Sequence, residues 1–286
     1  MNSIDKARNR DDLINEILLT LYKNRETVAV LVEGPDDIEF FEKVFKKLEN
    51  VVYFESLSGC EGLYELLKEP DLDSRRIIAV RDKDYTDPAA PEKYPPRMFA
   101  YDDCAMELMI LHHPYIQETL RDCYALKQES FPLDMMRHIA PFSLLRQKNA
   151  RNEWGIAFQE KCDGRGGYPI HAKTKPAPNA KKPVPDIEEV FKLYEKDYPE
   201  LNGQYEVCQA DSKALADDAL WDITNGHDIC RALGSVSSLS SGSLGEVGYR
   251  KLMFFIYRFE DFQSTRLYHA LSAYRLSNGR RPFAAI

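Results

Sequence analysis

Apolar positions along the first hundred residues follow two alternating spacings, and this alternation predicts an α/β fold. Residues 11–23 carry apolar side chains at helical spacing, which predicts an amphipathic helix. The run VAVLV at 28–32 is continuously apolar, as is typical of a strand buried on both faces of a parallel sheet. Three more apolar runs predict strands at 51–56, 75–80 and 97–101, with helical patterns between them. Strands that alternate with helices indicate a mostly parallel sheet flanked by helices.

The pattern changes further along the chain and predicts three parts. Residues 1–112 are expected to form the α/β core with its N-terminal helix. Residues 113–204 are expected to form a mainly helical, basic insertion, in which 161–187 is rich in Gly, Pro and Lys and is typical of a loop. Residues 205–286 are expected to complete the core and to end in C-terminal helices, with 205–210 compatible with a late strand.

Acidic residues follow two of the predicted buried strands. Glu33 comes directly after 28–32, and Asp37 lies four residues on; Asp82 and Asp84 follow the strand at 75–80. Ligand sites of parallel sheets gather at the carboxyl ends of the strands, so these carboxylates are expected to converge. Clustered carboxylates repel one another unless they are protonated or bind cations, and Mg²⁺ prefers hard oxygen ligands. The pattern predicts a centre for Mg²⁺ or Mn²⁺, with two ions able to activate water and stabilise a leaving oxygen.

Four segments carry a resemblance to a known family. LVEGPDDIEFF at 31–41 and IIAVRDKD at 77–84 resemble the Toprim signature, and the aspartate four residues after the glutamate is similar to the OLD-type nucleases. DDCAMELMIL at 102–111 and WDITNGHDICRAL at 221–233 resemble a narrower group. That group comprises the stand-alone Toprim effectors of PARIS phage-defence systems, the AriB group, which are encoded beside an ABC-type ATPase.

The resemblance implies a Toprim-like fold and a metal-dependent nuclease that acts as a toxic effector in antiviral defence. In the family the matching acids bind metal, which here implies Glu33, Asp37, Asp82 and Asp84. Among them, Glu33, Asp82 and Asp84 are expected to be catalytic. Glu107 aligns with a characteristic acid after the fourth strand and is expected to be a further metal ligand.

Two residues of the second matching block add possible catalytic groups. Lys213 could supply a cation to the transition state, and His227 could transfer a proton, although capping or packing is the more ordinary role for this histidine. The chain has no nucleotide-hydrolysis motif of its own. We therefore expect a homodimer that is controlled by an ABC-type ATPase partner, with the apolar stripe LMFFIYRF at 252–259 as a contact surface.

Composition indicates the cellular compartment in which this chemistry would take place. The chain is 44% hydrophobic and 29% charged, and no apolar run approaches the roughly 20 residues of a membrane helix. Its N-terminus is charged and polar, and its six cysteines are scattered without a CxxC motif. This argues against a zinc site and a disulfide framework, and it suits a cytoplasmic protein without membrane association.

Charge is distributed unevenly along the chain. The formal net charge is −8, yet residues 137–183 contain ten Lys and Arg against three Asp and Glu. This basic segment suits a nucleic-acid surface, while the overall negative charge disfavours avid binding of duplex DNA. RNA such as tRNA is therefore favoured over DNA as the substrate. Four aromatic residues interleave with the basic residues and suit base stacking or, more commonly, a core: Phe142, Trp154, Phe158 and Tyr168.

Two other functions remain open. IIAVRDKDYT also satisfies the opening motif of haloacid-dehalogenase-type phosphohydrolases, in which Asp82 would be the nucleophile. That motif usually opens its fold, whereas here a complete βαβ unit precedes it. A non-catalytic regulatory subunit could instead keep the acids as a structural metal site. The nuclease interpretation is favoured over both.

Overall fold

The computed structural model describes seven stretches of the chain: 9–45, 48–85, 94–124, 130–158, 162–176, 183–239 and 242–283. Contacts within these stretches divide the chain into two compact units. Unit 1 consists of the described residues up to Asp102 and from Arg258 onward, and unit 2 extends from Asp103 to Tyr257.

Unit 1 is built on a parallel sheet of four strands in the order β2-β1-β3-β4. The strands have these bounds: β1 Val28–Val32, β2 Val51–Glu55, β3 Ile77–Arg81 and β4 Met98–Ala100. Every residue of the two central strands, β1 and β3, is buried. Burial on both faces is the reason that these runs are continuously apolar rather than alternating. The predicted α/β fold with a parallel sheet is therefore confirmed.

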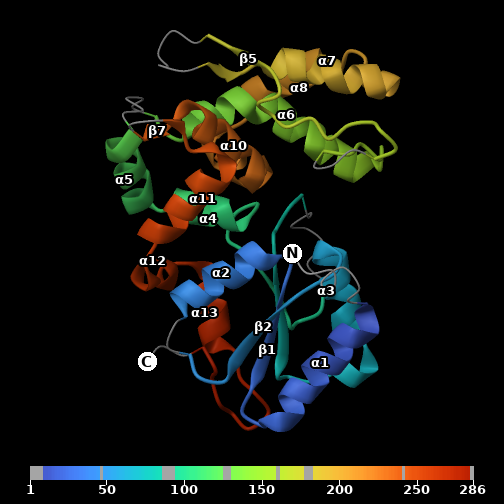
Figure 1. Ribbon diagram of the computed structural model, residues 1–286, viewed down its shortest axis with the longest axis vertical. Coiled ribbons are helices and arrows are strands. Elements are labelled where there is room, and N and C mark those ends of the chain that lie inside the picture. Colours follow the sequence, from blue (N-terminus) through green and yellow to red (C-terminus); the bar gives the residue numbers. More distant parts are fainter. Residues whose placement is uncertain are drawn as a thin grey trace. The chain divides into compact units, whose positions relative to one another are not determined.

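Helices cover both faces of this sheet, α1 and α3 on one side and α2 and α13 on the other (Figure 1). The helical elements of unit 1 are α1 Arg10–Lys23, α2 Pro35–Val44, α3 Gly59–Lys68, η2 Pro70–Leu72, α12 Phe259–Gln263 and α13 Arg266–Ala273. On the α1 side, Leu13 and Ile17 belong to one core cluster with Leu31 of β1. On the other side, Phe40 of α2 packs edge to face on Phe262 of α12, with ring centroids 5.6 Å apart. The C-terminal residues thus complete the core of unit 1.

Unit 2 is mainly helical. Its helices are α4 Met106–His112, α5 Pro114–Tyr124, α6 Leu133–Asn152, α7 Ile187–Asp197, η4 Pro199–Leu201, α8 Gln204–Lys213, α9 Asp217–Ile223, α10 Gly226–Val236 and α11 Gly245–Ile256. Two short antiparallel pairs accompany them, β5 Thr174–Lys175 with β6 Val184–Pro185 and β7 Ser238–Leu239 with β8 Gly242–Ser243. The long helix α6 contacts α7, α8, α9 and α10, so it forms the centre of the unit. The predicted helical insertion and helical C-terminus are present.

The boundaries of the parts differ from the expected ones. They lie after Asp102 and Tyr257, whereas the sequence predicts boundaries after 112 and 204. Helix α4 packs on α10 and α11, and therefore belongs to unit 2 rather than to the sheet. The expected strand at 205–210 is wrong: these residues lie in helix α8, which packs on α6. None of the helices described is long and apolar enough to cross a membrane.

Candidate metal centre

Three of the predicted metal ligands lie at one edge of the sheet of unit 1, where neighbouring strands end. Glu33 follows β1 directly, and Asp82 follows β3, which pairs with β1 in parallel register. The backbone N–H of Asp82 donates a hydrogen bond of 2.8 Å to Oε1 of Glu33. Asp84 lies two residues further, close enough for its charge to affect Glu33. The structure therefore brings together residues that the sequence separates by about fifty positions, as parallel strand ends require.

The arrangement strongly affects the ionisation of Glu33. Burial, followed by the negative charges of Asp84 and Asp37, raises the pKa of Glu33 to about 8. The hydrogen bond from Asp82 and the positive charge of Arg81 oppose this rise only in part. A buried carboxyl group with a raised pKa and like-charged neighbours is typical of sites that bind a cation or carry out chemistry.

Asp37 lies in the first turn of α2, and both of its carboxylate oxygens accept hydrogen bonds. The N–H of Gly34 donates to Oδ2 at 3.0 Å, which caps the helix, and the Tyr101 hydroxyl donates to Oδ1 at 2.6 Å. Asp37 is 8% exposed and Tyr101 is 2% exposed. Asp37 therefore has a structural role at the start of α2, and its negative charge contributes to the raised pKa of Glu33.

Arg81 holds the turn that presents the two aspartates. Its guanidinium donates to the carbonyl oxygens of Asp82 at 2.6 Å and of Lys83 at 3.2 Å. It also lies 4.0 Å from the centroid of the Tyr94 ring, and the residue is only 7% exposed. At Asp84 the backbone is left-handed, with φ at 48°, a conformation that Asp tolerates better than most residues. Arg81 is thus a buried residue that stabilises this turn through hydrogen bonds to its backbone.

A glycine that the sequence did not single out also belongs to the centre. Gly59 starts α3 with φ at 55°, and a Cβ built on it would lie 3.4 Å from Oε2 of Glu33. Cys60 follows it, and burial together with the Glu33 charge raises the pKa of this thiol to about 11. The first residues of α3, Gly59 and Cys60, therefore lie close to Glu33. The only sequence signal was the pair of glycines in SGCEG at 58–62, which is a weak one.

The four acids Glu33, Asp37, Asp82 and Asp84, here called the acidic centre, suit a divalent cation by their chemistry. All supply hard oxygen donors, and a bound cation would offset the repulsion that raises the pKa of Glu33. Within the described residues, however, no group of three or more His, Cys, Asp or Glu side chains is arranged as a finished metal-ion site.

Glu107 and Lys213, the other two predicted site residues, lie in unit 2. Glu107 is 4% exposed on α4, and its Oε1 lies 3.9 Å from the Arg250 guanidinium. Lys213 is exposed at the last position of α8. Neither residue belongs to the unit that holds the acidic centre.

Glu107 is part of a set of buried or half-buried charges, here called the ion network. Its members come from α4, α6, α10 and α11: Glu107, Arg146, His227, Asp228, Arg231, Glu246 and Arg250. Arg146 donates two hydrogen bonds to the fully buried Asp228, at 2.5 and 3.1 Å. His227 Nδ1 lies 2.6 Å from Glu246, and this hydrogen bond is the main reason that the pKa of His227 is raised. His227 thus takes part in a hydrogen-bonded ion pair with Glu246.

Two of the four aromatic residues of the basic segment lie in a core, whereas Trp154 and Tyr168 are half-buried. Phe142 and Phe158 are buried and pack on Tyr194 of α7. The Tyr168 hydroxyl donates to Asp197 at 2.9 Å. Lys173 is exposed, Lys175 pairs with Asp186, and Lys181 and Lys182 lie outside the described residues.

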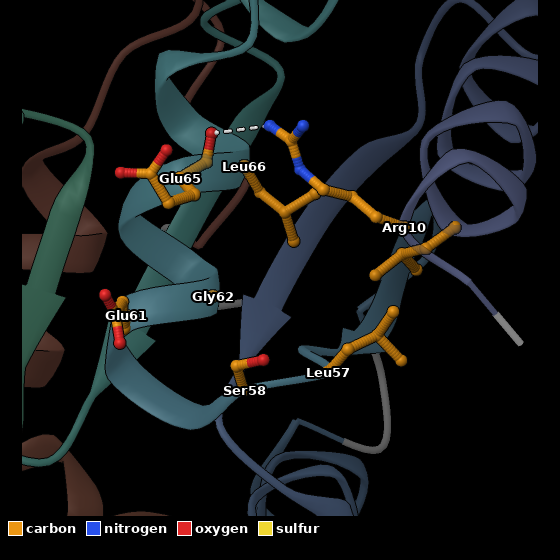
Figure 2. Close-up of a pocket in the computed structure, with 8 residues that line it drawn as sticks. Arg10, Leu57, Ser58, Glu61, Gly62, Glu65 and Leu66 are labelled. Carbon is orange, nitrogen blue, oxygen red and sulfur yellow. Dashed lines mark hydrogen bonds between the residues drawn. The ribbon is translucent and has the colours of Figure 1, made fainter.

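A cavity of about 430 Å³ lies between α1 and α3. Figure 2 shows Arg10 reaching across it to the Glu65 carbonyl oxygen, with Glu61 at the other end. Leu13 and Leu66 form its apolar lining. The lining carries two carboxylates, Glu61 and Glu65, and one arginine, Arg10. Its net negative charge therefore disfavours binding of a phosphate group.

Comparisons of the chain with protein-family models, with curated proteins and with solved structures gave no match.

Proposed function

We propose that this protein is a metal-dependent nuclease that hydrolyses phosphodiester bonds at the acidic centre. The observation that supports it most is the convergence of Glu33, Asp82 and Asp84 at the carboxyl edge of two adjacent parallel strands, with the pKa of Glu33 raised to about 8. Mg²⁺ or Mn²⁺, two ions by this proposal, would be held by these residues together with Asp37. A bound ion of this kind supplies a water of lowered pKa and charge for the leaving oxygen.

The chain's own residues contribute positioning. The N–H of Asp82 orients the Glu33 carboxylate, while Gly34 and Tyr101 orient Asp37. Ligands whose geometry is set before the substrate arrives need less reorganisation during the reaction.

The proposal extends to the biological role. Following the Toprim resemblance, the substrate is RNA, such as tRNA, in preference to DNA, and the protein acts as a toxic effector in antiviral defence. A homodimer and an ABC-type ATPase partner are part of this proposal. In support, α11 exposes the apolar side chains of Val247 and Phe255, which are 54% and 81% exposed. Large exposed apolar side chains are common at protein interfaces.

The decisive experiment incubates the purified protein with total cellular RNA and DNA, in EDTA and with added Mg²⁺ or Mn²⁺. Cleavage is expected only with metal and only in the wild type and in Glu39→Gln, a control with the same charge change at an exposed position of α2. Glu33→Gln is expected to be inactive. Normal cleavage by Glu33→Gln would contradict the proposal, and a trapped aspartyl phosphate on Asp82 would support a phosphohydrolase instead.

A further inference from the structure

A second cavity of unit 1, of about 500 Å³, lies beside the acidic centre. Its lining comes from the end of β3, from β4 with the residues around it, and from the start of α13. Several residues of the cavity lining are neighbours of the acids of the acidic centre. Arg81 and Lys83 flank Asp82 in sequence, and Tyr101, which donates to Asp37, also lines the cavity. A molecule in this cavity would therefore contact the residues that position the acids.

The charged lining of this cavity is mostly basic. Arg81, Lys83 and Arg266 contribute three cations, against one carboxylate from Asp102. That carboxylate accepts hydrogen bonds from the backbone N–H groups of Arg266 at 2.7 Å and Leu267 at 2.9 Å. Asp102 is thus used to fix the start of α13. The Arg266 guanidinium also contacts Asp102, donating to its backbone carbonyl oxygen at 2.7 Å with Nε 3.6 Å from its carboxylate, and the Arg266 side chain is 78% exposed. The cavity has the charge that a phosphate group requires, unlike the acidic cavity between α1 and α3.

Aromatic rings and prolines make up much of the remaining lining. Tyr94 lies under the Arg81 guanidinium, and Phe99 packs edge to face on Tyr274 with ring centroids 5.8 Å apart. Flat rings next to cations are the combination on which unpaired nucleobases and their phosphates bind. A volume of about 500 Å³ lies within the range of small-molecule sites, large enough for one nucleotide.

We infer that this cavity binds one unpaired nucleotide of the substrate strand, next to the phosphodiester that is cut at the acidic centre. Lys83 and Arg266 bind its phosphate, and the aromatic lining contacts its base. A paired and stacked nucleotide cannot enter a pocket of this size with its neighbours, so the site selects single-stranded nucleic acid. This inference rests on the proposed function and adds to it the form of the substrate.

The test measures binding of fluorescent six-nucleotide RNA and DNA single strands and of an RNA hairpin, in EDTA so that no cleavage occurs. The variants are Lys83→Gln and Arg266→Gln, with Lys23→Gln as the control, an exposed basic residue of α1 far along the chain from the cavity lining. Each cavity variant is expected to weaken single-strand binding about tenfold and to reduce the slope of log affinity against log salt by about 0.7. The control is expected to bind like the wild type, and the hairpin stem to bind at least tenfold more weakly than the single strands.

Failure of this inference is distinguishable from failure of the nuclease proposal. Unchanged binding by both cavity variants, or equal binding of the hairpin stem, would overturn the inference even if metal-dependent cleavage is found. Loss of single-strand binding in both variants would support the inference even if no cleavage is found. Melting temperatures equal to that of the wild type ensure that the variants are folded.

Discussion

Carboxylates gather in both units of this protein, but their surroundings have opposite effects on them. In the acidic centre of unit 1, burial and the charge of Asp84 raise the pKa of Glu33 to about 8. In the ion network of unit 2, burial also opposes ionisation of Glu246. There the hydrogen bond from His227 and the charge of Arg231 outweigh it and lower the pKa of Glu246 to about 2.

The difference lies in how the negative charge is balanced. In the ion network each carboxylate lies within 4 Å of an arginine, as Glu107 does to Arg250. In the acidic centre the positive charge of Arg81 opposes the rise in the pKa of Glu33 only in part. A balanced network stabilises a fold, whereas a partly balanced cluster favours an added cation. Buried acids therefore indicate a metal site only where cations of the chain do not already neutralise them.

The largest expected effect is that of Asp84→Asn on cleavage. Asparagine tolerates the left-handed backbone at this position, so the turn is expected to persist. Activity is expected to fall by roughly 10²-fold or more, because a proposed metal ligand is lost. Stability without metal is expected to be equal or higher, because the like charge that raises the pKa of Glu33 is removed. The cleavage assay described above measures the activity, and thermal melts with EDTA and with Mg²⁺ measure the stability. A clear loss of metal-free stability would mean that this acid is structural.

In the ion network, removing a charge is expected to have the opposite effect on stability. Asp228→Asn leaves the buried Arg146 without its countercharge, and Asp228 itself is fully buried. The free energy of unfolding is expected to fall by about 3–5 kcal/mol in urea denaturation. The matched control is Glu188→Gln on α7, whose ion pair with Lys192 is about half exposed on both sides. That change is expected to cost less than about 1 kcal/mol, and equal costs for the two variants would remove the distinction between buried and exposed pairs.

The acids of unit 1 could be predicted from the sequence, while their supports could not. The apolar residues of the predicted strands at 28–32 and 75–80 indicate buried parallel strands, and the acids after them are expected to share an edge. The hydrogen bond from Tyr101 to Asp37 joins residues that are 64 positions apart, and no local pattern encodes such a contact. The burial of Arg81 likewise depends on Tyr94.

The limits of sequence reasoning are clearer still in unit 2. The apolar pattern of α4 predicts a helix with buried faces, but it does not reveal that α10 and α11 cover it. The sequence therefore places Glu107 with the sheet, whereas its neighbours are Arg250 and Gly226. For the same reason, Phe142 and Phe158 could not be assigned to a core or a surface from their spacing alone.

A smaller effect is expected from pH. The pKa of Glu246 is depressed to about 2, so its contribution to stability is present above its ordinary pKa of 4.5 and is lost as pH falls toward 2. The pKa of His227 is raised, so its contribution is present below its ordinary pKa of 6.5 and is lost as pH rises through its value in the fold. The pair therefore stabilises unit 2 most between pH 4.5 and 6.5.

The measurement is the difference in unfolding free energy between the wild type and Glu246→Gln at several pH values. The difference is expected to be largest near pH 5.5, on the order of 2 kcal/mol, because the half-exposed histidine is partly screened. It is expected to shrink strongly toward acid and only partly toward alkali, where Arg231 still pairs with Glu246. A difference that is independent of pH would show that this pair does not titrate with folding.

A final contrast between the two regions concerns the space around two glycines, Gly226 and Gly34. A Cβ on Gly226, the first residue of α10, would overlap the carboxylate of Glu107 and lie 3.0 Å from the Cβ of Ala105. Glu107 is 4% exposed and lies beside Arg250, so it has little room to move away. Gly226→Ala is therefore expected to destabilise the protein by about 1–3 kcal/mol, as overpacking does.

In Gly34→Ala, beside the acidic centre, the new Cβ would lie 3.9 Å from the nearest atom on an extended backbone, and stability is expected to change by less than about 0.5 kcal/mol. Equal melting temperatures for the two variants would mean that Glu107 moves freely, and the ion network would then be as adjustable as the acidic centre.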